Sequence, residues 1–340
     1  MAPLRTSRNR NENMDQGILK TTSVLSRAYK WDHLLARAGY RRMYHRVDPG
    51  LYSLGNPTPE SNVFVTANYT LSFDALRTAL KGVDCFILVL DTKGINVWCA
   101  AGKGTFGTDE LVSKIQSTAL EKAVIHRRVI LPQLAAPGVA AHEVRKRTGF
   151  SVEYGPVRAE DLPLNLQTHQ ATEEMRRVRF DLKDRASLVP VEIKNNMLWA
   201  VPVPIILYLV SGLWMALLAL AIFVAGVVLF PLLLPFLPTK HFASKGIILG
   251  AAAGFAVWLA RVLSGGWSFG VEAFGYLITY ALLVSPWVGY ISLNFTGAST
   301  YTSKTGVRRE IFRFVPVMAL MFICGLVMLA ILGLANTLGW

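Results

Sequence analysis

The stretch NVFVTANYTLSFDALRTALKGVDCFILVLDT, residues 62–92, decides the fold of the first half of this 340-residue chain. Its two ends, residues 62–68 and 85–92, are short apolar runs rich in β-branched and aromatic side chains, as buried strands are. Between them, residues 72–82 space their apolar positions like one face of a helix, with Ser72 as the expected N-cap and Gly82 as the expected end. A strand, a helix and a second strand in this order predict a parallel sheet covered by helices.

The same alternation continues to about residue 157. Residues 127–134 and 150–157 are two more apolar runs, and helical spacing recurs at 108–124, with Thr108 as the expected N-cap, and at 138–149, which ends at Gly149. We therefore predict a Rossmann-like parallel-sheet α/β domain. Ligands of such sheets bind outside the carboxyl ends of the strands. These ends are expected at residues 66–68, from Asp91 onward, at 133–138 and at 154–158.

The second half of the chain has the composition of a membrane protein. Residues 195–239 contain no Asp, Glu, Lys or Arg, and residues 314–340 are uncharged as well. A membrane helix needs about 20 apolar residues, and Ser211-Gly212 offers a turn inside the first long run. The sequence therefore predicts an all-α transmembrane domain of about five helices, at roughly 197–211, 213–236, 246–263, 271–293 and 315–337.

The charge distribution gives the expected orientation. The formal net charge is +13, and six Lys or Arg residues crowd just before the first span, at positions 176, 177, 179, 183, 185 and 194. We interpret this as juxtamembrane charge, which argues against nucleic acid as the partner and for membrane lipid. Five spans also place Lys240, Lys245 and the basic cluster 304–313 on the side of the α/β domain, and Arg261 alone on the other. The positive-inside rule then predicts a multi-pass protein of the cytoplasmic membrane with its soluble domain in the cytoplasm.

These observations divide the chain into three parts. Residues 1–44 are expected to form a flexible N-terminal arm without the apolar segment of a signal peptide. Residues 45–195 are the predicted α/β domain, and residues 196–340 are the predicted membrane domain. Three cysteines in the whole chain cannot form a disulfide framework, so the soluble part belongs in a reducing compartment.

Residues 94–108, GINVWCAAGKGTFGT, follow the second strand and so lie on the expected binding edge. Residues 102–107 match the dinucleotide pattern G-x-G-x-x-G, but the acid expected about 20 residues later is missing, because the next strand ends in Leu131-Pro132-Gln133. A P-loop is excluded, since no glycine stands five residues before Gly102. C-x-x-C and H-E-x-x-H spacings are absent too, which argues against zinc.

Cys99, inside this stretch, has two interpretations. It is either a small buried hydrophobe, as most cysteines are, or a ligand beside space that Ala100, Ala101, Gly102 and Gly104 leave clear for a planar macrocycle. Lys103 lies one helical turn later, where its charge would favour a thiolate if it is not simply solvated. Cys85, in an apolar strand, and Cys324, in a predicted span, fit the role of buried hydrophobes better.

The motif Asn96-Val97-Trp98-Cys99-Ala100-Ala101-Gly102-Lys103 resembles the cap-helix motif of the corrinoid proteins of microbial mercury methylation, the HgcA family, whose corrinoid-binding domain is CdhD-like. The similarity extends to VTANYTLSFDALRTALKG, LPQLAAPGVAAHEVRKRTGF and YGPVRAEDLP, and to NFTGASTYTSKTGVRRE before the last span. It covers residues 45–195 closely and the membrane half more loosely. The usual D-x-H-x-x-G motif of His-ligated corrinoids does not occur in this sequence, which agrees with a different lower ligand.

The resemblance implies a cobalamin-type cofactor with Cys99 as the lower axial ligand of cobalt, and transfer of its methyl group to Hg(II). It also implies an anaerobic host, a methyl-donating methyltransferase of one-carbon metabolism, and a ferredoxin with two [4Fe–4S] clusters as electron donor. On this basis we expect Val97 and Trp98 to pack the cap helix beneath the ring and Asn96 to cap it. Other expected cofactor-binding residues are Thr66, Ser72, Ala100, Ala101, Gly102, Lys103, Thr105 and Gln133.

Two other functions remain open at this level. One is a corrinoid methyl carrier of one-carbon metabolism with another acceptor, which would use the same residues. The other, of a different class, is a membrane transporter or receptor with a cytosolic sensor domain. The predicted spans contain no obvious ionisable relay, which argues against the transporter.

Overall fold

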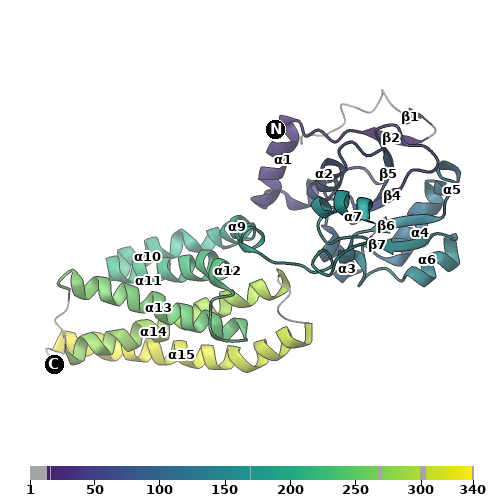
Figure 1. Cartoon of the computed structure of the whole chain (residues 1–340). Coiled ribbons are helices and arrows are strands. Elements are labelled where there is room, and N and C mark those ends of the chain that lie inside the picture. Colours follow the sequence, from purple (N-terminus) through teal and green to yellow (C-terminus); the bar gives the residue numbers. More distant parts are fainter. Residues whose placement is uncertain (1–13, 16, 169, 267–269, 299–303, 339–340) are drawn as a thin grey trace. The chain divides into compact units, whose positions relative to one another are not determined.

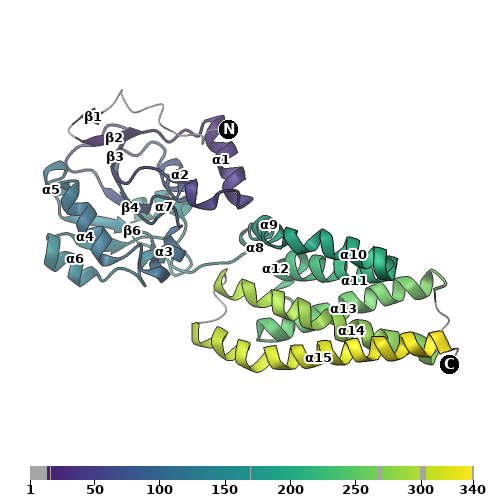
Figure 2. The same cartoon turned by 180° about the vertical axis from the view of Figure 1, so that it is seen from behind.

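The alternating apolar runs of the first half form a seven-stranded sheet in a computed structural model that describes residues 14–15, 17–168, 170–266, 270–298 and 304–338. The chain divides into two compact units, Met1–Arg179 and Phe180–Trp340. Figure 1 and Figure 2 show the first unit as a sheet with helices on both faces and the second as a set of long helices. The predicted fold class, an α/β domain followed by about five apolar helices, is confirmed.

The sheet combines the four predicted strands with three more. Its order is β1-β2-β3-β5-β4-β6-β7, and its strands are β1 (Met14–Asp15), β2 (Ile18–Thr21), β3 (Gly50–Leu54), β4 (Val63–Ala67), β5 (Cys85–Leu90), β6 (Arg128–Leu131) and β7 (Ser151–Tyr154). The predicted strands β5, β4, β6 and β7 are parallel neighbours. The sheet as a whole is mixed, because β3 runs antiparallel to β5 and β1 antiparallel to β2.

The helices of this unit connect the strands. They are α1 (Arg27–Arg37), η2 (Arg42–Tyr44), α2 (Thr70–Ala79), α3 (Val97–Lys103), α4 (Thr108–Ser117), α5 (Leu120–Ala123), η3 (Gln133–Ala135), α6 (Ala141–Thr148), η4 (Ala159–Asp161) and α7 (Leu162–Thr168). Two predicted N-caps were wrong, since α2 begins after Tyr69 rather than Ser72, and α4 after Gly107 rather than Thr108. The predicted end at Gly149 is confirmed by its left-handed φ of 77°.

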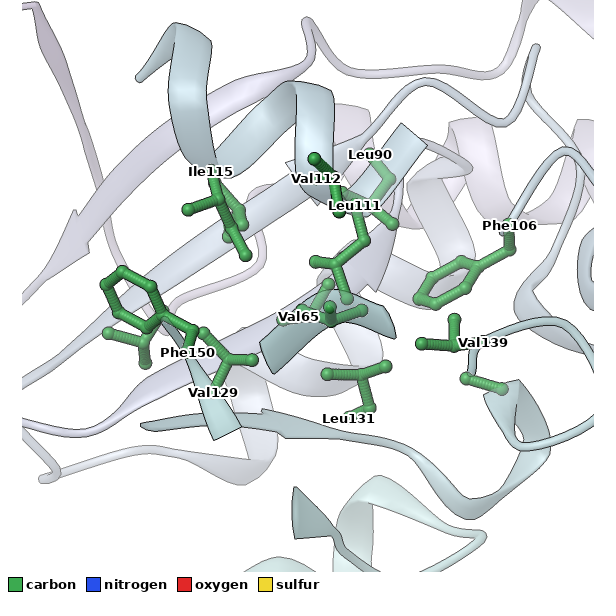
Figure 3. Close-up of a cluster of buried hydrophobic side chains, with 14 of the residues drawn as sticks. Val65, Leu90, Phe106, Leu111, Val112, Ile115, Val129, Leu131, Val139 and Phe150 are labelled. Atoms are coloured by element: carbon green, nitrogen blue, oxygen red, sulfur yellow. The ribbon is translucent and has the colours of Figure 1, made fainter. Parts of the chain in front are cut away.

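Two apolar cores lie on the two faces of the sheet. Under α4 and α6, side chains of β4, β5 and β6 meet Leu111, Ile115 and Phe150 (Figure 3). On the other face, Phe64, Ile87 and the α2 residues Phe73 and Leu76 form a second cluster. Both faces are buried because the strands are apolar at nearly every position, as the sequence indicates for a parallel sheet.

The described part of the predicted N-terminal arm is packed on this unit. Strand β2 pairs with β3, in the register Leu19 with Tyr52. Helix α1 contacts α2, and His33 Nε2 lies 2.6 Å from Asp74 Oδ2 between them. Residues 18–44 therefore extend the sheet and cover α2. Residues 1–13 of the expected flexible arm lie outside the described residues.

The second unit consists of helices that are long and apolar enough to cross a membrane. Five candidate spans cover Leu182–Ser211, Leu213–Leu233, Phe242–Leu263, Val271–Gly297 and Thr305–Leu338. Their elements are α8 (Leu182–Ala186), α9 (Val189–Ala200), α10 (Pro202–Ser211), α11 (Leu213–Phe223), the π-helical η5 (Val224–Leu229), α12 (Phe230–Leu233), α13 (Phe242–Leu263), α14 (Val271–Ser292), η6 (Leu293–Ala298) and α15 (Lys304–Leu338). The expected turn is present, because Gly212 separates α10 from α11 with a φ of 82°.

Close helix contact in this unit depends on small residues. Gly246, Gly250 and Gly254, four residues apart on α13, face α14, where a Cβ on Gly250 would lie 2.6 Å from Ser285 Cα. Small residues at this spacing let two membrane helices approach closely. At one end of the unit, Glu310 of α15 accepts hydrogen bonds from the Ala243 amide and lies 3.3 Å from His241 Nδ1, which joins α15 to the start of α13.

Candidate functional site

Helix α3 carries the cysteine motif on a short, well-anchored segment after β5. Asn96 is its N-cap, as predicted, and the Asn96 Oδ1 atom accepts a hydrogen bond of 2.9 Å from the Cys99 amide. Gly104 ends the helix in the left-handed region with a φ of 82°, so the chain reverses immediately afterwards. Cys99 itself is exposed, which leaves its thiol accessible to a ligand from outside.

The loop that enters α3 is held by an asparagine that the sequence analysis missed. Asn68, buried at the end of β4, accepts hydrogen bonds at its Oδ1 from the Thr92 amide, the Thr92 hydroxyl and the Gly94 amide, at 3.1, 2.9 and 3.0 Å. The Thr92 hydroxyl also lies 2.6 Å from the Ile95 carbonyl. The loop needs this support because Lys93 and Gly94 both have positive φ, 58° and 73°. The sequence signal that could have identified Asn68 is its position at the end of a predicted strand, in Thr66-Ala67-Asn68.

The back of α3 is packed without spare space. A Cβ on Gly138 would lie 2.3 Å from the Phe106 carbonyl oxygen and 3.0 Å from Ala101 Cα. Phe106 is fully buried beside Val139 (Figure 3), and the Phe106 amide donates to the Ala100 carbonyl at 3.1 Å. The residues after α3 and the loop before α6 thus fix the helix from behind, while its outer side remains open.

A cavity of about 370 Å³ opens beside α3, at the carboxyl ends of the parallel strands. After β4 the chain passes to β5 on one side and returns to β6 on the other, so the gap between β4 and β6 is the switch point at which such sheets bind ligands. The lining is mostly apolar and comes from β4, α2, the start of α3, the end of β6 and residues 156–162. Its size falls within the usual range for small-molecule pockets.

The predicted site residues fall into four groups. Thr66, Ser72, Asn96, Val97 and Trp98 line it. Cys99, Gly102 and Lys103 are exposed on α3 beside it, and a Cβ on Gly102 would meet no atom within 4 Å. Ala100 and Ala101 point into the core instead, so they contribute packing rather than clear space around the sulfur. Thr105 lies 3.4 Å from the Ala100 carbonyl, and the Gln133 side chain accepts from Arg176 at 3.0 Å.

The three cysteines differ in their surroundings. Burial raises the pKa of the Cys85 thiol to about 12, and the charge of Asp84 adds to this, so Cys85 stays protonated inside β5. Cys324 is exposed on α15, in a candidate span. Of the three, Cys99 alone is an exposed thiol at the ligand-binding edge of the sheet.

Comparisons with known proteins agree with this geometry. Residues 41–164, which include β3 to β7 and α3, match the CdhD family, described as CO dehydrogenase/acetyl-CoA synthase delta subunit. Three similar proteins are gamma subunits of the acetyl-CoA decarbonylase/synthase complex. The one from Methanopyrus kandleri is 34% identical over 119 residues, which is 34% of this chain and 25% of that protein.

The other two relatives give similar values. The subunit from Archaeoglobus fulgidus is 32% identical over 114 residues, 33% of this chain and 24% of its own length. The subunit from Methanosarcina acetivorans is 31% identical over 121 residues, which is 34% of this chain and 25% of that protein. This chain thus spans about a quarter of the length of these relatives, and the CdhD match ends before the apolar helices begin. Residues 41–164 are therefore similar to the CdhD family, whose members bind corrinoids.

Proposed function

We propose that this chain is a membrane-anchored corrinoid methyltransferase that uses Cys99 as the lower axial ligand of cobalt and transfers a methyl group to Hg(II), forming methylmercury. The observation that carries the proposal is an exposed thiol on a rigid helix at the switch point of a CdhD-family domain. The complete motif of residues 96–103, with its resemblance to mercury-methylating proteins, selects Hg(II) as the acceptor.

The residues around Cys99 fit a corrinoid. A macrocycle needs an open surface, and Gly102 and Gly104 present no side chain there. The neighbouring cavity is apolar enough for a planar aromatic group, and the Thr66, Ser72 and Asn96 side chains offer hydrogen-bonding groups to amides or a nucleotide tail. Trp98 lines the cavity from α3, so the same short helix presents the thiol and one wall of the pocket.

When bound, the corrinoid supplies a methyl group on cobalt, which an electron-rich thiolate ligand helps to release with its bonding electrons to the electron-poor Hg(II) substrate. The chain's own part is to hold the sulfur in place. Asn96 fixes the Cys99 amide, Asn68 and Thr92 fix the loop before it, and Gly138 fixes α3 from behind. Because Cys99 is exposed, its thiol proton can pass directly to water when the sulfur becomes a ligand.

The proposed partners follow from what this chain lacks and from its resemblance. Three cysteines are too few for the four thiolates of a [4Fe–4S] cluster, so we propose an external ferredoxin with two such clusters as the reductant of cobalt. A methyltransferase of one-carbon metabolism would supply the methyl group. The five apolar helices would anchor the protein in the cytoplasmic membrane, and the distribution of Lys and Arg would place the CdhD domain in the cytoplasm.

The visible absorption spectrum of the full chain in detergent, reconstituted with methylcobalamin, tests the ligand assignment. We expect a bound corrinoid whose spectrum changes in Cys99→Ala and stays unchanged in Cys324→Ala, the matched loss of an exposed cysteine. Reductant-dependent methylation of Hg(II) should be lost in Cys99→Ala and retained in Cys324→Ala. If Cys99→Ala methylated Hg(II) at the full rate, the assignment of Cys99 as the axial ligand would be wrong. A protein that binds no corrinoid would remove the function and favour a membrane receptor with a sensor domain.

A second candidate function is supported by the relatives themselves. The matching proteins are acetyl-CoA decarbonylase/synthase gamma subunits, so a corrinoid methyl carrier of one-carbon metabolism would use the same domain. Incubating the methylated protein with Hg(II) and, separately, with thiol acceptors discriminates the two. Methyl loss to Hg(II) alone supports the first function, and loss only to the other acceptors supports the carrier.

A further inference from the structure

The outward side of α1 carries two large apolar side chains, where an exposed helix face is normally polar. Trp31 is 58% exposed and Leu34 is 55% exposed. Arg27, Lys30 and Arg37 are exposed on the same side, because residues three or four apart share one face of a helix. We call these five side chains the outer face of α1. Large apolar side chains gathered in this way are more informative than a single exposed leucine.

The inward side of the same helix buries Ala36 and is held to α2 by polar contacts of Asp32 and His33. His33 Nε2 lies 2.6 Å from Asp74 Oδ2 of α2. Asp32 Oδ2 accepts a hydrogen bond of 2.9 Å from the hydroxyl of Thr70, also on α2. A second histidine, His45, lies 2.6 Å from the other oxygen of Asp32. These bonds fix the rotation of α1 on α2, which Figures 1 and 2 show at the edge of the unit. The outer face therefore cannot turn inward to bury its apolar side chains.

The exposed apolar surface continues in the turn after α1. Tyr40, Met43 and Tyr44 are 50%, 51% and 74% exposed. Residues 27–44 contain five Lys or Arg and a single acid, Asp32, which faces inward. Tryptophan, tyrosine and leucine flanked by arginine and lysine are the composition of helices that lie in a membrane–water interface.

We propose that the outer face of α1 binds the surface of an anionic lipid bilayer. The proposal rests on the membrane anchoring proposed above, since a chain fixed in the bilayer keeps this helix at a high effective concentration near lipid. Positive charge beside exposed aromatic rings complements acidic headgroups, and each basic residue near such a surface strengthens binding about five-fold. A protein partner would also need groups to pair with these cations, and that alternative is an outcome of the test.

Photocrosslinking in nanodiscs tests this docking on the full chain. One sample carries p-benzoylphenylalanine in place of Leu34, and the matched control carries it in place of Ile125, which is 70% exposed on a different segment of the same unit. Nanodiscs contain phosphatidylcholine with or without phosphatidylglycerol. We expect phospholipid adducts at position 34, several-fold more with phosphatidylglycerol, and few at position 125. Lys30→Gln with Arg37→Gln should lower the adduct yield at position 34 to that of neutral nanodiscs.

The other outcomes are distinct. A chain that co-purifies with nanodiscs but forms no lipid adduct at position 34 overturns the docking and leaves the anchoring intact. Adducts with a protein, including a second copy of this chain, overturn the lipid assignment in favour of a protein interface. A chain that does not co-purify with nanodiscs removes the anchoring itself, and the docking with it.

Discussion

At the scale of single residues, burial separates Cys85 from Cys99. Cys85 and Cys99 lie only 14 residues apart, but Cys85 is enclosed in β5 and Cys99 is exposed on α3. A thiolate is the form that binds metals and reacts, and an apolar interior opposes it. The same side chain is therefore inert at one position and available as a ligand at the other.

The raised pKa of Cys85 predicts a loss of stability in alkaline solution. Burial raises the pKa of its thiol from the ordinary value of 9.0 to about 12 in the folded unit. Between these values the unfolded state binds fewer protons, so the free energy of unfolding falls as pH rises from about 9 and is undiminished by this group below it. Denaturant unfolding of the full chain between pH 8 and 11 measures this. Cys85→Ala should flatten the slope, whereas Cys99→Ala should not.

At the scale of elements, the position of α3 depends on what lies behind it. Gly138 and Ala101 are in backbone contact, and no side chain fits between them. The exposed side of the same helix has open space at Gly102. We therefore expect a methyl group added at Gly138 and one added at Gly102 to have opposite effects on stability.

Gly138→Ala should destabilise the sheet unit by about 1–3 kcal/mol, since the new Cβ meets backbone rather than a flexible side chain. Gly102→Ala should leave stability unchanged or raise it by up to about 1 kcal/mol, because alanine favours the helix. Thermal unfolding with corrinoid absent measures both. If Gly138→Ala were as stable as Gly102→Ala, α3 would not be held rigidly from behind.

The packing of α13 on α14 gives a comparable prediction for the second unit. In Gly250→Ala the added methyl would lie 2.6 Å from Ser285 Cα, whereas in Gly333→Ala it would meet no atom within 4 Å. We expect Gly250→Ala to lower the melting temperature of the helical unit in detergent, with a loss of about 1–3 kcal/mol. Gly333→Ala is the matched control, and an equal effect of both substitutions would contradict close packing at Gly250.

At the scale of the whole molecule, the chain joins two units that each have their own core. Their stabilities have different sources, because the first unit buries apolar strands on both faces of a sheet and the second consists of long apolar helices. Ligand binding at the switch point involves the first unit alone.

Corrinoid should therefore raise the stability of one unit only. A ligand at about 100 times its Kd stabilises the state that binds it by about 2.7 kcal/mol. Scanning calorimetry of the full chain in detergent should show two transitions, of which methylcobalamin shifts the one assigned to the sheet unit. Cys99→Ala should reduce that shift. A shift of both transitions together would mean that the two units unfold as one.

Most of the fold followed from local patterns. The strands at 63–67 and 85–90 and the helix between them were predicted because their apolar periodicity is strong. Strand β3 was missed because its pairing with β5 joins residues more than 30 positions apart. The N-caps Tyr69 and Gly107 make no side-chain capping hydrogen bond. For the site, the motif identified Asn96, Trp98 and Cys99, whereas the support from Asn68 needs contacts across 24 to 26 residues.

The sequence by itself determined the division into an α/β half and an apolar helical half, the strand order along the chain, and the cysteine motif, because periodicity and composition act within one element. Only the tertiary structure decided that Ala100 and Ala101 face inward, that the cavity opens between β4 and β6, and that α1 turns Asp32 and His33 toward α2. These features depend on which surfaces distant segments bring together. A side chain's exposure follows from those contacts, and no local pattern contains them.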